Sequence, residues 1–356
     1  MCGFVGLCKK NILDEKDINI VNSISKKLNH RGPNQNSDWI SLSRKVYLCH
    51  RRLSINDLSE EGIQPMTSQN GRYVIVFNGE IYNFLKLKKE FLEKGHKFKG
   101  RSDTEVLLCL IEKYGLKDAV SKLNGMYSFA LYDLNLKKIS LVRDKTGQKP
   151  LYFYKDKSSF FFTSELRNLN YLGIKLNICK NSLSYFFQLS YIPAPLTIFE
   201  NVYKLEKGNI LELNLDEFEL KNFNITHNSN DYNIKFKSKD FKIKKFDEIF
   251  SQVIEDHLIS DVSNGTLLSG GIDSTIITHY ANKVSNNKIS SYCVKSIDDT
   301  FDESVYAEKI AKKIGTNHTT LDFSKDEFFD ILKNIHKVYD EPFGDSSQIP
   351  PYLLFK

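Results

Sequence analysis

The order of strand-like and helix-like segments in the first half of the chain constrains its fold more than any other feature. Apolar residues recur at helical spacing over residues 17–29, and two further helical segments begin near Asn83 and at Ser102 or Asp103. Short apolar runs typical of strands lie before and after these two helices. These runs are residues 46–50, 73–77, 127–132, 138–143, 151–154 and 159–163. Strands, then helices, then strands again favour a layered α+β domain.

The chain is too long for one ordinary domain. At 356 residues we expect two domains, and a polar segment rich in Asn and Lys, residues 214–240, predicts the linker between them. The domains would then span residues 2–213 and 241–356. Lysines in and after the linker alternate with phenylalanines, a pattern that can bind nucleic acid. We interpret them instead as a solvated linker edge that precedes a helical apolar stripe beginning at Phe246, and we expect no nucleic-acid partner.

A strand, a Gly-rich turn and a helix follow one another in the second domain. Leu268 ends an apolar run, Ser269-Gly270-Gly271 follows, and a helix begins at Asp273 or Ser274. Glycines let the backbone approach a ligand closely, and hydroxyl groups and a helix N-terminus offer hydrogen-bond donors to an anion. A plain Gly-rich turn is the alternative. No G-x-x-x-x-G-K-[ST] pattern is present, which disfavours kinase or GTPase chemistry. Further strand and helix patterns favour a doubly wound α/β fold.

Cys2 carries a chemical argument of its own. Cysteine is small enough that Met1 is normally removed, which leaves a thiol and a free α-amino group on one residue. The ordinary pKa is roughly 8.5 for the thiol and roughly 7.7–8 for the amine, so the amine can serve as base for its own thiol. The alternative is a small apolar residue at the start of a buried strand.

Three other polar positions of the first domain also lie where a site could form. Asn78 and the N–H of Gly79 follow an apolar run and could hold a developing oxyanion, although Asn-Gly is also a common turn. Arg52 could pair with a carboxylate, or it could be a surface arginine. Asp103 could pair with an ammonium group, or it could cap a helix.

The motifs occur in an order that resembles the class II glutamine amidotransferases, which are N-terminal-nucleophile hydrolases. They are Cys2-Gly3, His30–Pro33, Arg52–Ile55, Asn78–Asn83 and Ser102–Glu105, and later segments extend the resemblance to about residue 170. The resemblance implies an αββα sandwich in which Cys2 attacks the side-chain amide of glutamine. It further implies that Asn78 and Gly79 form the oxyanion hole. The implied glutamine-binding residues are Arg52, Leu53, Ile55, Asn78, Gly79, Glu80 and Asp103. Asn29 departs from the arginine that many relatives have there.

The Gly-rich turn of the second domain is similar to the pyrophosphate loop of the ATP pyrophosphatase superfamily. This resemblance implies an adenine-nucleotide hydrolase-like α/β fold in which Val294 lies beside the adenine. The implied ATP-binding residues are Leu268, Ser269, Gly270, Gly271, Asp273, Ser274 and Val294. Mg²⁺ is expected to accompany the triphosphate. None of the six cysteines forms a C-x-x-C pair, so we expect no metal site built by the protein.

Together the two halves resemble the glutamine-hydrolysing asparagine synthetases. The resemblance implies glutamine, aspartate and ATP as substrates, with ammonia from the Cys2 reaction amidating an adenylated aspartate, and it is compatible with a homodimer. No stretch reads as a signal peptide or membrane span, so we expect a cytoplasmic enzyme. The chain stops at Lys356, and we expect the synthetase domain to be C-terminally incomplete.

Several alternatives to asparagine synthesis stay open at this stage. An amidotransferase of the same architecture could act on another carboxylate, such as a sugar acid. The chain could also be a truncated glutaminase or nucleotide-binding module without synthetase activity. Glucosamine-6-phosphate synthase and the purine-pathway amidotransferase share only the first domain, and the segment Ser269–Ser274 argues against both.

Overall fold

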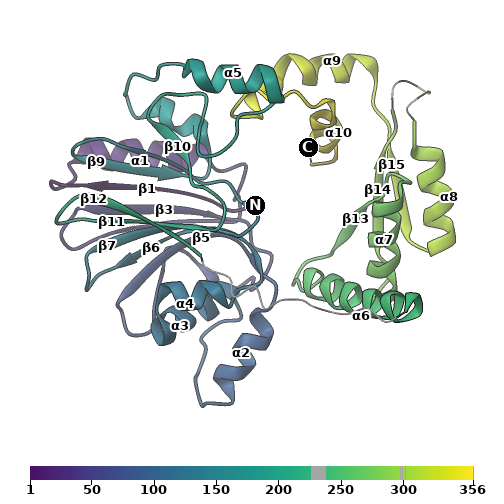
Figure 1. The fold of residues 1–356 in the computed structure, drawn as a ribbon, viewed down its shortest axis with the longest axis horizontal. Helices are drawn as coiled ribbons and strands as arrows, with labels where there is room; N and C mark the ends of the chain where they lie inside the picture. The colour runs from purple at the N-terminus through teal and green to yellow at the C-terminus, as the bar shows by residue number, and fades with distance from the viewer. Residues whose placement is uncertain (226–237, 297, 299, 301, 356) are drawn as a thin grey trace. The chain divides into compact units, whose positions relative to one another are not determined.

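The computed structural model describes residues 1–225, 238–296, 298, 300 and 302–355. Its contacts divide the chain into two compact units (Figure 1). The first is Met1–Asn228 with Asp340–Phe343, and the second is Ser229–Tyr339 with Gly344–Lys356.

Two antiparallel six-stranded sheets form the centre of the first unit. The first sheet has the order β10-β8-β9-β1-β3-β2 and the second the order β12-β11-β7-β6-β5-β4. The strands are β1 Gly3–Lys9, β2 Gln35–Ile40, β3 Val46–Arg52, β4 Met66–Thr67, β5 Tyr73–Ile81, β6 Gly125–Asp133, β7 Lys138–Arg143, β8 Tyr152–Lys155, β9 Ser159–Thr163, β10 Val202–Lys204, β11 Asn209–Asn214 and β12 Glu219–Asn224.

Alternation of side chains along the strands builds two apolar layers. In β1, Phe4 and Cys8 join the core between the sheets, whereas Val5 and Leu7 join the core under α1 (Glu15–Lys27). Helix α3 (Asp103–Tyr114) packs on β5 of the second sheet, beside α2 (Phe84–Leu92) and α4 (Leu116–Ser121). Figure 1 shows the resulting order of helix, sheet, sheet and helix. The predicted αββα sandwich is confirmed. A further helix, α5, spans Lys180–Leu189.

Strand β5 is longer than its sequence suggests. We predicted that Asn78-Gly79 stops the strand, but pairing with β6 continues to Ile81 opposite Gly125. A Cβ atom on Gly79 would lie 2.2 Å from the carbonyl oxygen of Met126, so only glycine lets the two strands run this close. The Asn-Gly pair is therefore part of a strand and not a turn.

The prediction that residues 214–240 form the linker is wrong in part. Residues 214–224 form the hairpin of β11 and β12 at the edge of the second sheet. Leu213, Leu215 and Phe218 are buried in the core between the sheets, a spacing that the abundance of Asn and Lys obscures. Residues 226–237 of the predicted linker lie outside the described residues.

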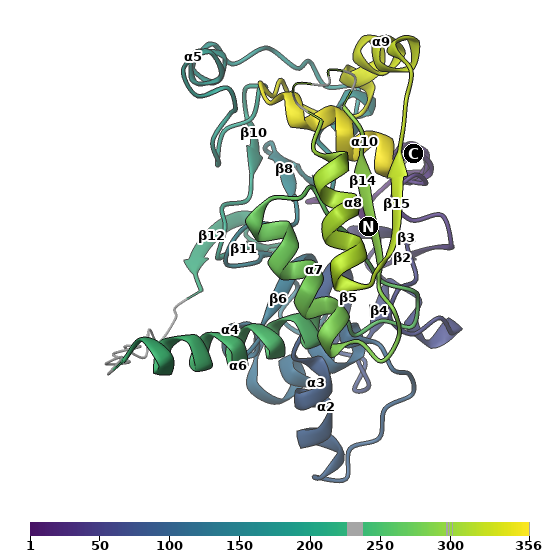
Figure 2. The same cartoon turned by 90° about the vertical axis from the view of Figure 1, so that its right-hand side faces the viewer.

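The second unit is built on a three-stranded parallel sheet, β13-β14-β15 (Gly265–Leu267, Ser290–Val294 and Asn317–Leu321). Helix α8 contacts both β14 and β15, and α7 contacts β13 (Figure 2). The helices are α6 Lys239–His257, α7 Ile272–Val284, α8 Ser304–Ile314, α9 Lys325–Asn334 and α10 Ile349–Phe355. Parallel strands joined through helices confirm the predicted α/β fold. Within the described part of the chain, no helix combines the length and apolar character needed to cross a bilayer.

Candidate functional site

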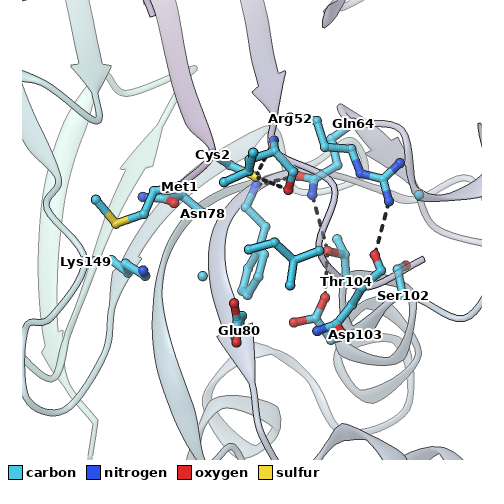
Figure 3. Close-up of a pocket in the computed structure, with 16 residues that line it drawn as sticks. Met1, Cys2, Arg52, Gln64, Asn78, Glu80, Ser102, Asp103, Thr104 and Lys149 are labelled. Carbon is cyan, nitrogen blue, oxygen red and sulfur yellow. Dashed lines mark hydrogen bonds between the residues drawn. The ribbon is translucent and has the colours of Figure 1, made fainter. Parts of the chain in front are cut away.

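One pocket of the first unit brings together all the residues predicted to handle glutamine. Figure 3 shows Cys2 and Asn78 on one side of it, with Arg52, Glu80 and Asp103 around the rest. Leu53, Ile55 and Gly79 also line it, as do residues to which sequence reasoning gave no role, among them Gln64, Thr104 and Lys149. Cys2 directly precedes β1, Arg52 ends β3, Asn78 and Glu80 lie on β5, and Asp103 begins α3.

Hydrogen bonds hold Cys2 in place directly before β1. Its Sγ accepts a bond from the N–H of Leu53 at 3.4 Å, and its carbonyl oxygen accepts one from Nε of Arg31 at 2.9 Å. Arg31 is itself paired with Glu165, 3.3 Å away, to which His30 also bonds at 2.8 Å. These contacts fix the direction of the thiol.

The local environment favours a neutral amine beside a protonated thiol. Burial raises the pKa of the Cys2 thiol, and the hydrogen bond to Leu53 opposes this only in part. Burial lowers the pKa of the N-terminal amine of Met1 to about 6; Cys2 opposes this shift, and the cations Arg31 and Lys149 strengthen it. This environment disfavours the charged form of an amine, and a neutral amine can take the thiol proton.

Asn78 lies in the pocket with its amide group unsatisfied. The side chain is 1% exposed, and neither its nitrogen nor its oxygen has a hydrogen-bond partner among the described residues. Burying an unpaired amide costs free energy, so this group is suited to a partner that arrives with the substrate. Asn78 and Gly79 are neighbours on β5, which places a side-chain donor and a backbone donor side by side.

Arg52 is buried rather than on the surface. It is 4% exposed and closes the loop that follows β3. Its Nη1 donates to Oε1 of Gln35 at 2.7 Å and to the Ser59 carbonyl at 2.9 Å, and its Nη2 donates to the carbonyls of Asn56 and Asp57. The guanidinium is thus rigidly held before any substrate binds.

Asp103 occupies the first turn of α3, and Ser102, rather than Asp103, is the N-cap. The Oδ2 of Asp103 accepts a bond from the N–H of Ile81 at 3.0 Å. Burial raises the pKa of Asp103 to about 6; the Ile81 bond opposes the shift, and nearby Glu80 adds to it. A substrate ammonium group would relieve this unfavourable burial of charge.

The Gly-rich loop of the second unit leads from β13 into α7. Gly270 has φ +89°, a conformation that favours glycine, and an added Cβ would lie 3.0 Å from Cβ of Tyr306. The hydroxyls of Ser269 and Ser274 are 3.1 Å apart, and the Ser269 N–H points to Ser274 Oγ at 3.3 Å. The loop's polar groups therefore bond mainly to one another.

A cavity of about 1020 Å³ lies beside this loop, and its volume suits a nucleotide. Leu268, Ser269 and Val294 of the predicted ATP site line it, together with apolar residues such as Phe323 and Phe328. The remaining predicted residues lie along the loop and the first turn of α7 outside the cavity lining; they are Gly270, Gly271, Asp273 and Ser274.

The same two-part division appears in comparisons with known proteins. Residues 1–224 match the glutamine amidotransferase domain family, and residues 245–356 match the asparagine synthase family. A putative glutamine-hydrolysing asparagine synthetase of Methanocaldococcus jannaschii is 31% identical over 99% of this chain and 71% of the relative. The chain belongs to the glutamine-hydrolysing asparagine synthetase family.

Other members of the asparagine synthetase family are longer than this chain. Asparagine synthetase 1 of Bacillus subtilis is 32% identical over all of the chain, which spans 55% of that enzyme. Among solved structures, glutamine phosphoribosylpyrophosphate amidotransferase from B. subtilis has a TM-score of 0.51 at 16% identity, over 96% of this chain and 94% of its own. At that identity the likeness concerns the fold alone.

Proposed function

We propose that this chain carries the glutaminase and nucleotide-binding parts of a glutamine-dependent asparagine synthetase. Glutamine would be hydrolysed in the Cys2 pocket, and the ammonia would amidate an aspartate that the second unit has adenylated with ATP. The observation that carries the glutaminase assignment is the unsatisfied, buried amide of Asn78 beside Cys2 in one pocket. Family membership supports the synthetase reaction and aspartate as the acceptor.

The chemistry of glutamine hydrolysis follows from the pocket once Met1 is removed. The neutral amine takes the Cys2 thiol proton while Sγ forms a bond to the amide carbon, and the carbonyl oxygen becomes an oxyanion held by Asn78 and the Gly79 N–H. The tetrahedral intermediate then collapses. The carbon–nitrogen bond breaks, the amine returns its proton to the leaving nitrogen, and ammonia departs. Water attacks the thioester, which yields glutamate and restores the thiol.

The remaining pocket residues would recognise the amino-acid end of glutamine. We assign the α-amino group to Asp103 and Glu80, because both are acidic and line the pocket. The α-carboxylate is assigned to Arg52. Four N–H groups of Arg52 already contact Gln35 and the loop carbonyls, so the carboxylate would compete with one of these contacts. Leu53 and Ile55 would shape the pocket around the substrate.

In the second unit we assign the ATP phosphates to the loop residues Leu268, Ser269, Gly270 and Gly271 and to the first turn of α7, with Asp273 and Ser274. Val294 would lie against the adenine. No group of three His, Cys, Asp or Glu side chains in the described ranges could hold a metal ion unaided. The carboxylate of Asp273, in the first turn of α7, would suit a Mg²⁺ ion that is bound chiefly by the triphosphate. Mg²⁺ would neutralise phosphate charge and orient the leaving pyrophosphate.

The state of the cysteines bears on the cellular compartment in which the reaction takes place. All six cysteines are free thiols, which supports a reducing compartment, and we propose the cytoplasm. The partners would be the small molecules glutamine, aspartate and ATP, and a homodimer stays an expectation from the resemblance.

Glutamate release from glutamine tests the glutaminase half of the proposal. The chain, with loss of Met1 checked by intact mass, should release glutamate, and Cys2→Ala should abolish the release. Turnover that survives in Cys2→Ala would refute the assigned nucleophile. The synthetase half is tested by AMP release from ATP in the full-length gene product. AMP release should require aspartate, and equal release with a sugar acid alone would refute aspartate as the acceptor.

A further inference from the structure

The edge of β5 next to the pocket is completed by side chains in place of a strand. β4 pairs with β5 only at Met66 opposite Ile75 and at Thr67 opposite Val74. Further along β5, Oε1 of Gln64 accepts a bond from the Phe77 N–H at 2.6 Å. Nε2 of His50 lies 2.9 Å from the Phe77 carbonyl oxygen. Because a carbonyl only accepts, Nε2 of His50 carries the hydrogen and donates it.

The alternation of a strand then defines where the Gly79 N–H points. In an antiparallel pair, the N–H groups of every second residue lie on the same edge. The N–H of Phe77 is held by Gln64 and that of Ile81 by Asp103, both away from β6. The Gly79 N–H lies between them on this same edge, facing the pocket that Gly79 lines.

The two side chains that hold this edge are linked to each other. Nε2 of Gln64 donates to Oγ1 of Thr104 at 3.3 Å, and Oγ1 of Thr104 donates to Oδ1 of Asp103 at 3.4 Å. Both Gln64 and Thr104 are buried and line the pocket (Figure 3). A continuous path of hydrogen bonds thus runs from Phe77 through Gln64, Thr104 and Asp103 to Ile81, alongside the segment that carries Asn78 and Gly79.

We propose that Gln64 is a positioning residue for glutamine hydrolysis. It holds the open edge of β5 so that Asn78 and the Gly79 N–H meet the oxyanion, and through Thr104 it ties this edge to Asp103. The inference rests on the proposed glutaminase function. Because the oxyanion exists only in the transition state and the intermediates, loss of Gln64 should lower kcat more than it raises KM. Loss of the Thr104 hydroxyl should act through Asp103 and raise KM.

Gln64→Met, which removes both hydrogen bonds while keeping a similar side-chain volume, tests this role. We expect kcat for glutamine hydrolysis to fall about tenfold to a hundredfold, less than the loss of an oxyanion donor itself, with KM within about threefold. The matched control is Gln69→Met. Gln69 is exposed, bonds to the Lys97 carbonyl and lies outside this pocket. The control should retain wild-type kcat and KM.

Inhibition by the γ-aldehyde analogue of glutamine distinguishes a positioning role of Gln64 from a merely structural one. Sγ of Cys2 adds to the aldehyde carbon, and the thiol proton passes to the aldehyde oxygen, so that this tetrahedral adduct presents its oxygen to Asn78 and Gly79. Its inhibition constant should rise in Gln64→Met by the same factor by which kcat falls. Two results would overturn the proposal. One is inhibition of Gln64→Met as strong as that of the wild type. The other is a fall in kcat matched by an equal rise in KM, together with a lower Tm.

If Gln64→Met does not fold, Thr104→Val still tests the hydrogen-bonded link from Gln64 to Asp103. This variant keeps the shape of Thr104 but lacks the hydroxyl, and KM should rise about fivefold or more while kcat stays within about threefold. A wild-type KM in Thr104→Val would overturn the link between Gln64 and Asp103. Glutamate release by the wild type and its loss in Cys2→Ala are measured in the same series. Failure of those two results would refute the proposed function itself, separately from the role of Gln64.

Discussion

The glutamine pocket and the Gly-rich loop differ in how fully their polar groups are held before a ligand binds. In the pocket, Asn78, Arg52 and Asp103 are all buried, and the last two bond to residues distant in the sequence. In the loop, Ser269 is exposed, and its hydroxyl bonds to Ser274 five residues away. Buried groups with fixed partners are preorganised, whereas exposed loop groups take their final positions on binding. Substitutions should therefore act differently in the two regions.

The largest effect is expected at Asn78. Asn78→Ala removes the side-chain donor of the oxyanion hole, and kcat for glutamine hydrolysis should fall about 10²- to 10³-fold. Because the side-chain amide of Asn78 lacks a hydrogen-bond partner within the described structure, the variant should unfold at a Tm equal to or above that of the wild type. Steady-state kinetics and thermal unfolding measure both. A large drop in Tm would show that the pocket is not preorganised in the way the structure indicates.

Gly270→Ala should weaken ligand binding in the second unit by changing the shape of the Gly-rich loop. The substitution forces a side chain into a left-handed conformation and against Tyr306, so the loop should lose its shape. We expect the affinity for ATP, measured by calorimetry, to fall about tenfold or more. Glutamine hydrolysis should stay at the wild-type rate. Gly315→Ala is the matched control, because Gly315 also has positive φ but an added Cβ meets nothing within 4 Å. Equal ATP affinity in the two variants would contradict the prediction.

Arg52→Lys tests whether glutamine binding needs the rigidly held guanidinium or only its positive charge. Lysine keeps the charge but cannot reproduce the four contacts to Gln35 and the loop carbonyls. We expect KM for glutamine to rise about tenfold with a smaller change in kcat. Arg51→Lys, on the neighbouring residue whose Nε bonds to the Ser25 carbonyl, is the control and should leave KM unchanged. A KM unchanged in Arg52→Lys would remove Arg52 from substrate binding.

The sequence predicted the parts of this molecule that local patterns encode. Apolar runs predicted β5, β6 and β9, and helical spacing predicted α1 and α3. The family resemblance that the short polar motifs carry implied which residues meet in one pocket. Two predictions were wrong because a long-range contact decided the outcome. The backbone of β6 keeps Asn78-Gly79 in a strand, and the core buries Phe218 within a polar segment.

Some pocket residues could not have been found from local patterns. Gln64 precedes a proline and belongs to no periodic segment, and its role depends on Phe77 and Thr104, which lie 13 and 40 residues away. Lys149 lies within the part of the chain that the resemblance covers, yet its neighbours in the sequence do not show that it is buried and lines the pocket with Cys2. Such residues act through contacts that only the folded chain creates, so the structure was needed to identify them.

The smallest effect, and the sharpest test of preorganisation, is expected at Lys149. Lys149 is 6% exposed and lines the pocket with Cys2, and its charge helps to lower the pKa of the Met1 amine. We expect the same effect on the Cys2 amine that becomes the N-terminus once Met1 is removed. Lys149→Met removes that cation, so the pKa of the amine should rise and less of it should be neutral at a given pH. Only the neutral amine can accept the thiol proton. The acid limb of kcat/KM should therefore shift to higher pH, by about half a unit or more.

Lys145→Met is the control for this shift. Lys145 is exposed and lies outside the pocket lining, so its loss should leave the pH profile in place. A shift of the acid limb to lower pH in Lys149→Met would show that Lys149 does not act through its charge on the amine. A shift of the same size and direction in both variants would show a response to net charge alone. The pH profile thus separates a fixed charge in a buried pocket from the general field of a basic protein, which salt would screen.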